Sequence, residues 1–255
     1  MLFDPTPKPA KGESHAPASK GALPGRPARR LVLRLLALAA LILIGWHAWI
    51  FAEVWWLRGH DPRTTAFMER GLERLRQSNP SARLQQRWVP YERIANDLKR
   101  AVIAGEDQRF LEHSGFDLHA IGEAIDRNER RGNVRHGGST ISQQLAKNLF
   151  LSPRRTWPRK AEEAVITVMI ETALPKRRIL EIYLNVIEWG NGIYGAEAAA
   201  QHYFGRPAFD LSPDEAAHLA AMIPSPRSYT HNPSTPYLDE RTEFLEEALE
   251  RVRIP

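Results

Sequence analysis

An uninterrupted apolar run near the N-terminus constrains this 255-residue chain more than any other feature. Residues 35–52 read LLALAALILIGWHAWIFA and contain no charged side chain. Residues 31–33 extend the apolar character upstream, despite Arg34, to the ~20 residues that a membrane-spanning helix needs. The sequence therefore predicts a transmembrane anchor over residues 31–55.

The residues that flank this run predict its orientation. Arg26, Arg29, Arg30 and Arg34 precede it, whereas the acidic Glu53 follows it. The positive-inside rule then places the N-terminus in the cytoplasm and the residues after about position 55 outside. A cleaved signal peptide is the alternative, but the run is long for one and no small-x-small cleavage site is evident. Tryptophans typical of an interfacial belt cluster toward the outer end: Trp46, Trp49, Trp55 and Trp56.

Composition bounds what the rest of the chain can be. Residues 1–30 are rich in Pro, Ala, Gly, Ser and Lys without an apolar period, which predicts a disordered cytoplasmic tail. The roughly 200 residues after the anchor suffice for one substantial core. The chain has no cysteine, so disulfides and thiolate chemistry are excluded. Its net charge of +5 indicates an anionic partner such as nucleic acid, lipid head groups or a phosphate-bearing substrate.

Apolar spacing and helix start signals predict a mainly α fold after the anchor. No stretch alternates polar and apolar residues for long enough to indicate a strand. Thr140 and Gln143 have capping-box spacing, and Ser212 followed by Pro213 is a strong helix start. The predicted helices cover residues 65–77, about 94 to 106, those after Asp117 and after Thr140, Pro158 to about Leu174, Lys176 to about Glu188, and Ser212 to just before Pro224.

The segment from Arg127 to Lys160 is strongly basic, with nine Lys or Arg residues against one acid. Most such charges are solvated, but Lys147 shares a helical face with Gln143 and Gln144. This helix follows a Gly-Gly-Ser turn, whose backbone N–H groups are suited to bind an anion. The cluster suits a diphosphate better than a double helix, because no exposed aromatic residues or recognition helix are clearly interleaved with the cations.

Two glutamates are candidates for catalysis. Glu106 continues the apolar face of Leu98 and Val102 at i+4 steps, so it is either structural or a base whose pKa is raised by partial burial. Glu163 lies in the apolar segment RKAEEAVITVMIE and needs partners, which the cations just upstream can supply. Together they indicate glycosyl or phosphoryl transfer, although spacing alone does not separate glycosyl transfer from hydrolysis. By contrast, we interpret His113 as a hydrogen-bonded structural group and Asp107 as a structural residue that helps to fix the turn after the helix.

Five segments carry a more specific pattern. They read EDQRFLEHSG (106–115), GGSTISQQLAKNLFL (137–151), RKAEEAVITVMIE (159–171), KRRILEIYLNVIEWGNGIYGAEAAAQHYFG (176–205) and LSPDEAAHLAAMIPSPRSY (211–229). In this order they closely resemble the motifs of the peptidoglycan glycosyltransferases (glycosyltransferase family 51), lysozyme-like enzymes found alone or fused to penicillin-binding transpeptidases. The chain has neither S-x-x-K nor K-T-G, the transpeptidase signatures, so it resembles the monofunctional biosynthetic form.

The resemblance implies roles for individual residues. Glu106 matches the family's general base, which deprotonates the 4-hydroxyl of GlcNAc on lipid II for attack on the anomeric carbon of the lipid-linked MurNAc. The attack inverts α to β and expels undecaprenyl diphosphate, which Lys147 and Arg155 would stabilise by their charge. Glu163 matches the family's second essential glutamate, whose role stays open. Glu171 also fits the third motif, and we interpret it as structural. Three further residues match polar groups that line the cleft: Arg109, Ser139 and Gln144.

The resemblance also implies an architecture. We expect a juxtamembrane helical region over residues 56–90 and a lysozyme-like, two-lobed glycosyltransferase domain over residues 91–255. The expected location is the bacterial inner membrane, with the domain in the periplasm. The expected partners are lipid II, the lipid-linked glycan chain and membrane lipid, with other cell-wall synthesis or division proteins as further candidates and no nucleic acid. Four residues fit lipid contact and core packing equally well: Phe116, Phe150, Leu151 and Trp157.

Two alternatives compete with this interpretation. A lysozyme-like lytic enzyme would share the fold and a glutamate, but it would not need Lys147, Arg155 or an anchor. A non-catalytic membrane scaffold would tolerate loss of Glu106. No cofactor is expected, and no metal site is predicted because no three-ligand cluster with metal spacing is evident. The sequence leaves open whether a divalent cation assists.

Overall fold

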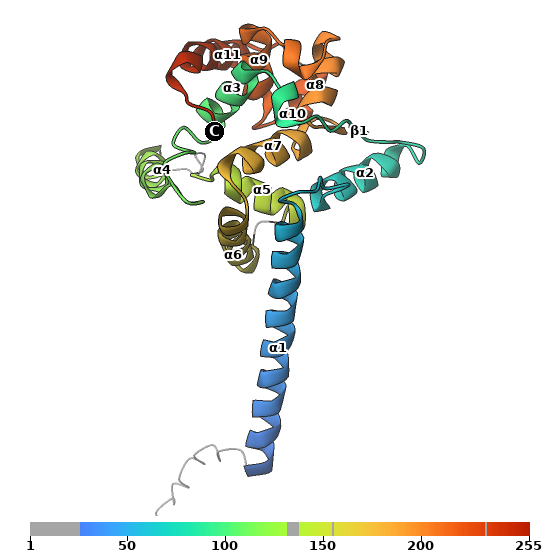
Figure 1. Ribbon diagram of the computed structural model, residues 1–255, viewed down its shortest axis with the longest axis vertical. Coiled ribbons are helices and arrows are strands. Elements are labelled where there is room, and N and C mark those ends of the chain that lie inside the picture. The colour runs from blue at the N-terminus through green and yellow to red at the C-terminus, as the bar shows by residue number, and fades with distance from the viewer. Residues whose placement is uncertain (1–25, 132–137, 155, 233) are drawn as a thin grey trace, which may run out of the picture. The chain divides into compact units, whose positions relative to one another are not determined.

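The computed structural model describes residues 26–131, 138–154, 156–232 and 234–255. The chain divides into two compact units, residues 1–47 and residues 48–255, and helix α1 (Arg26–Trp56) passes from the first into the second (Figure 1). Within α1, the residues from Arg29 to Trp56 form a helix long and apolar enough to cross a membrane. This finding is compatible with the predicted single-pass anchor.

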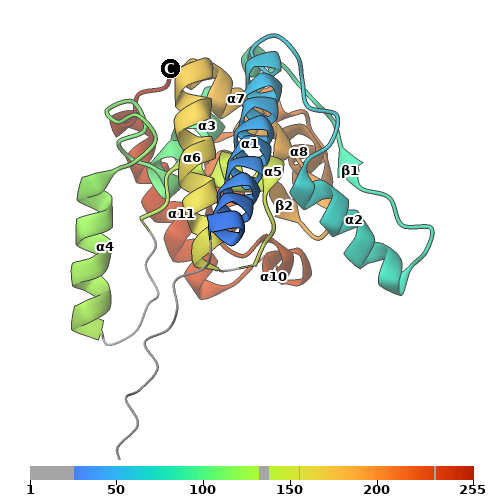
Figure 2. The same cartoon turned by 90° about the horizontal axis from the view of Figure 1, so that it is seen from below.

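The second unit is built mainly from helices, as the sequence predicts. Helices α2 and α4 lie at opposite edges of it, and α5 packs between α6 and α7 (Figures 1 and 2). The core includes the fully buried Leu98, Leu145 and Leu184. The helices and strands after α1 are α2 (Ala66–Ser78), β1 (Gln85–Gln86), α3 (Asn96–Glu106), α4 (Leu118–Arg131), α5 (Ile141–Phe150), α6 (Trp157–Ala173), α7 (Lys176–Val186), β2 (Glu188–Gly190), β3 (Ile193–Tyr194), α8 (Ala196–Phe204), α9 (Pro213–Met222), α10 (Pro226–His231) and α11 (Pro236–Ala248), with short 3-10 turns at Tyr91–Arg93, Ala208–Asp210 and Leu249–Arg251.

The last turns of α1 belong to the core of this unit. Ile50 and Val54 are fully buried there. The connection that follows is held by Arg178 of α7, which donates hydrogen bonds to the carbonyl oxygens of Leu57 and His60 at 2.8 and 2.7 Å. The stretch after the predicted anchor is therefore packed into the domain.

The predicted helix starts are confirmed. The Thr140 side chain accepts a hydrogen bond from the backbone N–H of Gln143, and the Gln143 side chain accepts one from the N–H of Thr140. Ser212 and Glu215 make the same reciprocal pair at the start of α9, and Thr65 caps α2. These bonds satisfy N–H groups that have no partner inside the helix.

A small sheet departs from the prediction that no strand would form. Its strand order is β1-β3-β2, with β1 parallel and β2 antiparallel to β3. The strands are too short to show alternation, and the local chain path creates them. Gly195, between β3 and α8, has φ +84°, and a Cβ there would lie 2.7 Å from the carbonyl oxygen of Asn185, so the chain requires glycine where it leaves the sheet. The Asn185 side chain in turn bonds both backbone groups of Val89, which fixes the segment after β1.

Helix α11 was also absent from the prediction. It packs against α9 and α3. Leu238, Thr242 and Leu245 are its buried residues, at i, i+4 and i+7. The helix starts with a Thr235 cap and Pro236 in the first turn, so a start signal and an apolar period were both present in the sequence. The consequence for function is that α11 lies against the helix that ends at Glu106.

Candidate active site

The carboxylate of Glu106 lies at the C-terminal end of α3, on the same face as the fully buried Leu98 and Val102. Its side chain is only 12% exposed. Gln144 of α5 donates a hydrogen bond from Nε2 to Glu106 Oε2 at 2.8 Å, and Nη2 of Arg241 lies 3.8 Å from Oε1. Burial raises the pKa of Glu106, and these neighbours oppose that rise only in part. A carboxylate of this kind is suited to accept a proton near neutral pH.

The orientation of Gln144 is set by Tyr183 of α7. Tyr183 is fully buried, and its hydroxyl donates to Gln144 Oε1 at 2.9 Å. Burial raises the pKa of Tyr183 well above its ordinary value, so the hydroxyl keeps its proton and stays a donor. Because the amide oxygen is occupied in this way, the amide N–H group faces Glu106.

Two cavities are lined by these residues and their neighbours. One, of about 340 Å³, is lined by Glu106 together with Arg109 and Ser139. The other, of about 370 Å³, is lined by Gln144 and Lys147. The hydrogen bond between Gln144 and Glu106 links one lining residue of each cavity, so the walls of the two cavities are in contact there. Burial lowers the pKa of Lys147, which places a poorly solvated cation beside the second cavity.

Glu163 of α6 is 3% exposed, and its partners are the ones that the sequence predicts. Nη1 of Arg159 lies 2.6 Å from Oε2, and Lys160 Nζ contacts Oε1. Lys160 also reaches Ser139 Oγ at 3.5 Å, which connects this cluster to the first cavity. Both carboxylate oxygens of Glu163 are therefore engaged by cations of its own helix.

Comparison with known proteins decides the family. A family model described as Transglycosylase matches residues 73–250, more than half of the chain. The chain belongs to the transglycosylase family. A "Biosynthetic peptidoglycan transglycosylase" of Azoarcus sp. (strain BH72) is 60% identical over 76% of this chain and 84% of that protein. Proteins of the same name are 53% identical in Thiobacillus denitrificans, over 86% and 94% of the two chains, and 49% identical in Nitrosospira multiformis, over 89% and 99%.

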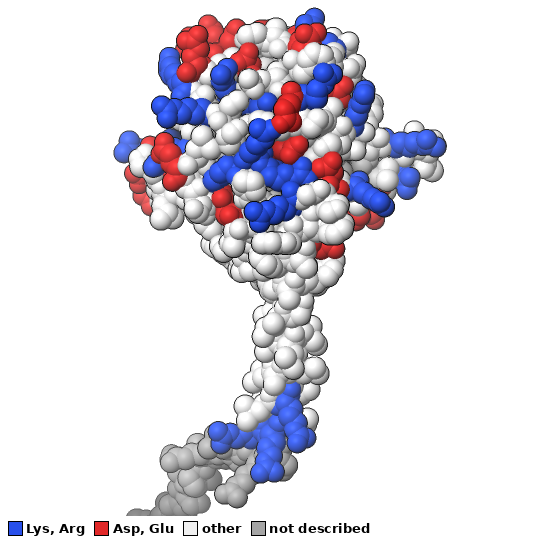
Figure 3. All heavy atoms as spheres, viewed as in Figure 1, with Lys and Arg blue, Asp and Glu red and all other residues white. Residues whose placement is uncertain are grey.

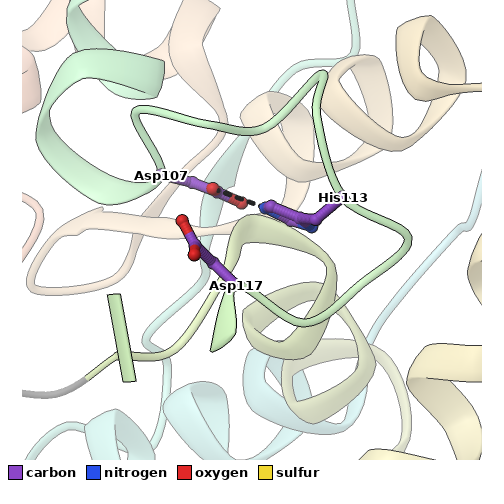
Figure 4. A group of neighbouring side chains, drawn as sticks. All are labelled: Asp107, His113 and Asp117. Atoms are coloured by element: carbon purple, nitrogen blue, oxygen red, sulfur yellow. Dashed lines mark hydrogen bonds and ion pairs between the residues drawn. The ribbon is translucent and has the colours of Figure 1, made fainter. Parts of the chain in front are cut away.

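A cluster of two buried aspartates and a histidine lies in and just after the first motif of this transglycosylase. Figure 4 shows Asp107, His113 and Asp117, whose ligand-type atoms lie within 4.8 Å of one another. Protein hydrogen bonds already engage them. Asp107 accepts from His113 Nε2 at 2.8 Å and from the N–H of Ile141 at 3.0 Å, and His113 Nδ1 accepts from the N–H of Gly115. The predicted structural roles of Asp107 and His113 are therefore confirmed.

The bond from Ile141 shows how the first N–H groups of α5 are paired. The carboxylate of Asp107 accepts from the N–H of Ile141, and the Thr140 cap accepts from that of Gln143. The Gly-Gly-Ser turn just before them lies partly outside the described residues, so its predicted anion-binding N–H groups stay a prediction. This helix start serves to hold the first motif against the second, and the cations of the site come from side chains such as Lys147.

Three residues named in the sequence analysis remain: Arg109, Glu171 and Arg155. Arg109 is half-exposed and pairs with Glu112 at 2.7 Å and with Asp117 at 3.6 Å. Glu171, interpreted as structural, accepts from Ser142 Oγ and from Lys176 Nζ. Arg155 lies outside the described residues. The structure thus brings together five of the predicted positions: Glu106, Arg109, Ser139, Gln144 and Lys147.

Sequence reasoning missed two residues of this site. Tyr183 lies inside the fourth motif, where only its position on the apolar face of a helix distinguished it. Arg241 follows the last motif and has several acidic residues close to it in the sequence, so its spacing gave no reason to pair it with Glu106. Both act across large sequence separations, which local spacing does not reveal.

Proposed function

We propose that this transglycosylase extends peptidoglycan glycan strands from lipid II at the outer face of a bacterial inner membrane. The acceptor is the GlcNAc 4-hydroxyl of lipid II, and the donor is the lipid-linked MurNAc at the end of the growing strand. The observation that carries the proposal is the position of Glu106, which lines a cavity and is hydrogen-bonded to Gln144, a residue that lines a second cavity together with Lys147.

Glu106 is the proposed general base. It takes the proton of the acceptor hydroxyl as that oxygen forms a bond to the donor's anomeric carbon from the face opposite the diphosphate. The bond from the anomeric carbon to the diphosphate oxygen breaks, and the configuration changes from α to β. The raised pKa of Glu106 supports this role, because a proton acceptor works best when its pKa approaches the working pH.

Lys147 is the proposed electrostatic partner of the departing undecaprenyl diphosphate. It lies one helical turn from Gln144 on α5, and burial strengthens its interaction with any charge that develops in the cavity. We propose Arg155 for the same role, because it matches the second of the family's diphosphate-stabilising cations. A lytic enzyme has no diphosphate to stabilise, so this cation favours transfer over hydrolysis.

The proposed role of Glu163 is to hold the cations Arg159 and Lys160 in place beside the site. Both of its oxygens are engaged by Arg159 and Lys160. The carboxylate therefore fixes two positive charges near Lys147 and keeps one of them against Ser139. Ser139 and Arg109, which line the cavity beside Glu106, are proposed to bind the substrate's polar groups.

The lipid-linked substrate explains why the domain would be attached to a membrane helix. Arg29, Arg30 and Arg34 gather at the N-terminal end of α1, while the rest of the helix is almost free of charge (Figure 3). This asymmetry supports a cytoplasmic N-terminus. Trp157, at the start of α6, is 89% exposed, so we propose it as a lipid contact, whereas Phe150 and Leu151 pack against the core.

Labelled lipid II and the full-length protein in detergent test the proposal. We expect long glycan strands from the wild type, none from Glu106→Gln, and normal strands from Glu246→Gln, which neutralises an exposed acid on α11. Cleavage of preformed glycan without strand synthesis would favour the lytic alternative. A folded wild type with neither activity would favour the scaffold.

A further inference from the structure

Helix α11 supplies a cation to the base from outside the five motifs. Arg241 lies on α11, close to the buried residues Leu238, Thr242 and Leu245 that attach this helix to α3 and α9. Buried residues of α11 lie both before and after Arg241 in the sequence, so the backbone at Arg241 is held in place. The Arg241 side chain therefore reaches the end of α3 from a fixed position. The arginine is only 23% exposed.

The contacts of Arg241 are directed at the end of α3. Nη2 donates to the carbonyl oxygen of Gly105 at 3.3 Å and lies 3.8 Å from Glu106 Oε1. Its Nε is buried and has no hydrogen-bond partner among the described residues. Glu106 is the one carboxylate within ion-pair distance of Arg241 in the described part of the chain. An arginine held for folding alone would be expected to have its buried N–H groups satisfied.

Several other groups influence Glu106, and they define what Arg241 adds. Lys147 of α5 is a second cation, Asp107 is the nearby anion, and Tyr183 of α7 is neutral. Among the described residues, Gln144 donates the one side-chain hydrogen bond to the carboxylate. Arg241 is the cation that reaches Glu106 from the side of α11, on the oxygen that Gln144 leaves free.

We propose that Arg241 is a positioning residue, which orients the Glu106 carboxylate and keeps it ionised for proton abstraction. The proposal rests on the proposed function of Glu106 as the base. A cation near Oε1 favours the charged carboxylate, and its bond to the Gly105 carbonyl ties it to the adjacent peptide.

The pH dependence of strand synthesis distinguishes this role from a structural one. In Arg241→Gln the acidic limb of kcat/KM should move to higher pH, because without the cation Glu106 binds its proton more readily. At pH values below the acidic limb we expect kcat/KM to fall about tenfold relative to the wild type, which is less than the 10²- to 10⁴-fold effect of losing a general base. At pH values above the limb we expect only a small loss of kcat/KM. Arg241→Lys keeps the charge and should leave the limb close to that of the wild type. Arg206→Gln, which removes an exposed arginine between α8 and α9, should have no effect.

The pH profiles of the Arg241 variants test the inference separately from the proposed function. An unshifted limb in a folded Arg241→Gln, or an equal loss at every pH in both Arg241 variants, overturns the inference and leaves the proposed function intact. If Arg241→Gln does not fold, Arg241→Met replaces it, and failure of both neutral variants to fold also counts against the inference. Strand synthesis by Glu106→Gln, run alongside, would instead overturn the proposed function itself.

Discussion

Replacing Tyr183 with Phe removes a single oxygen atom from the chain of hydrogen bonds that ends at Glu106. The ring stays in the core, where Tyr183 is fully buried. The lost contact is the 2.9 Å bond from the Tyr183 hydroxyl to Gln144 Oε1. Without it Gln144 is free to turn its amide by half a rotation, which would direct a carbonyl oxygen at the carboxylate of Glu106.

The expected magnitudes follow from the burial of the two partners. A buried hydrogen-bond acceptor that loses its partner lowers the free energy of unfolding by about 1–3 kcal/mol. We expect the lower part of this range for Tyr183→Phe, about 1–1.5 kcal/mol, because Gln144 borders a cavity and water can replace the lost hydroxyl. For a domain of this size that change lowers Tm by about 2–6 °C. Activity should fall further, since the bond from Gln144 to the charged Glu106 is of a kind worth about 1.5–3 kcal/mol, or about 10- to 100-fold in rate.

Thermal unfolding and strand synthesis in one detergent measure both effects. Tyr237→Phe is the matched control, because it removes the same oxygen from a side chain of α11 that is 57% exposed. We expect the control to match the wild type in Tm and rate. A folded Tyr183→Phe that polymerises at the wild-type rate, even with a lowered Tm, would show that the Tyr183 bond stabilises the fold and is not needed to orient Gln144.

Three further changes test the charges and the surface. Burial raises the pKa of Glu106 from its ordinary value of 4.5, so the ionised carboxylate lowers the stability of the fold at neutral pH. Glu106→Gln removes this charge and should therefore raise Tm at pH 7. The gain in Tm should vanish as the pH falls below 4.5, where the wild-type carboxyl group is protonated in both the folded and the unfolded chain. Lys147→Ala should reduce the rate of strand synthesis by about 10²- to 10³-fold without lowering Tm, because its charge is poorly solvated; a normal rate would contradict its role with the diphosphate. Trp157→Ser should weaken flotation with lipid vesicles relative to Phe209→Ser, an exposed aromatic on another segment, and equal flotation would remove Trp157 as a lipid contact.

The sequence predicted those parts of the fold and site that depend on near neighbours along the chain. The cap at Thr140 and the cations beside Glu163 involve residues three or four positions apart, so their spacing is sufficient evidence. The position of Glu106 on the face of Leu98 and Val102 follows from the same periodicity.

The parts that escaped prediction depend on contacts between distant segments. Tyr183 reaches Gln144 across 39 positions of the chain, and Arg241 reaches Glu106 across 135. The sheet escaped because its strands are paired through a glycine hairpin and the Asn185 side chain, and they are too short for a period of two. Long-range pairing of this kind leaves no mark in local spacing.

The two glutamates of the site differ in what remains free on each carboxylate. Both oxygens of Glu163 are engaged by cations, Arg159 on one and Lys160 on the other. Glu106 has one bond from a neutral amide and one longer contact with Arg241, and it borders a cavity. Of the two carboxylates, Glu106 is thus the less fully paired. This difference supports the proposal that Glu106 abstracts the proton and that Glu163 orders the positive charges.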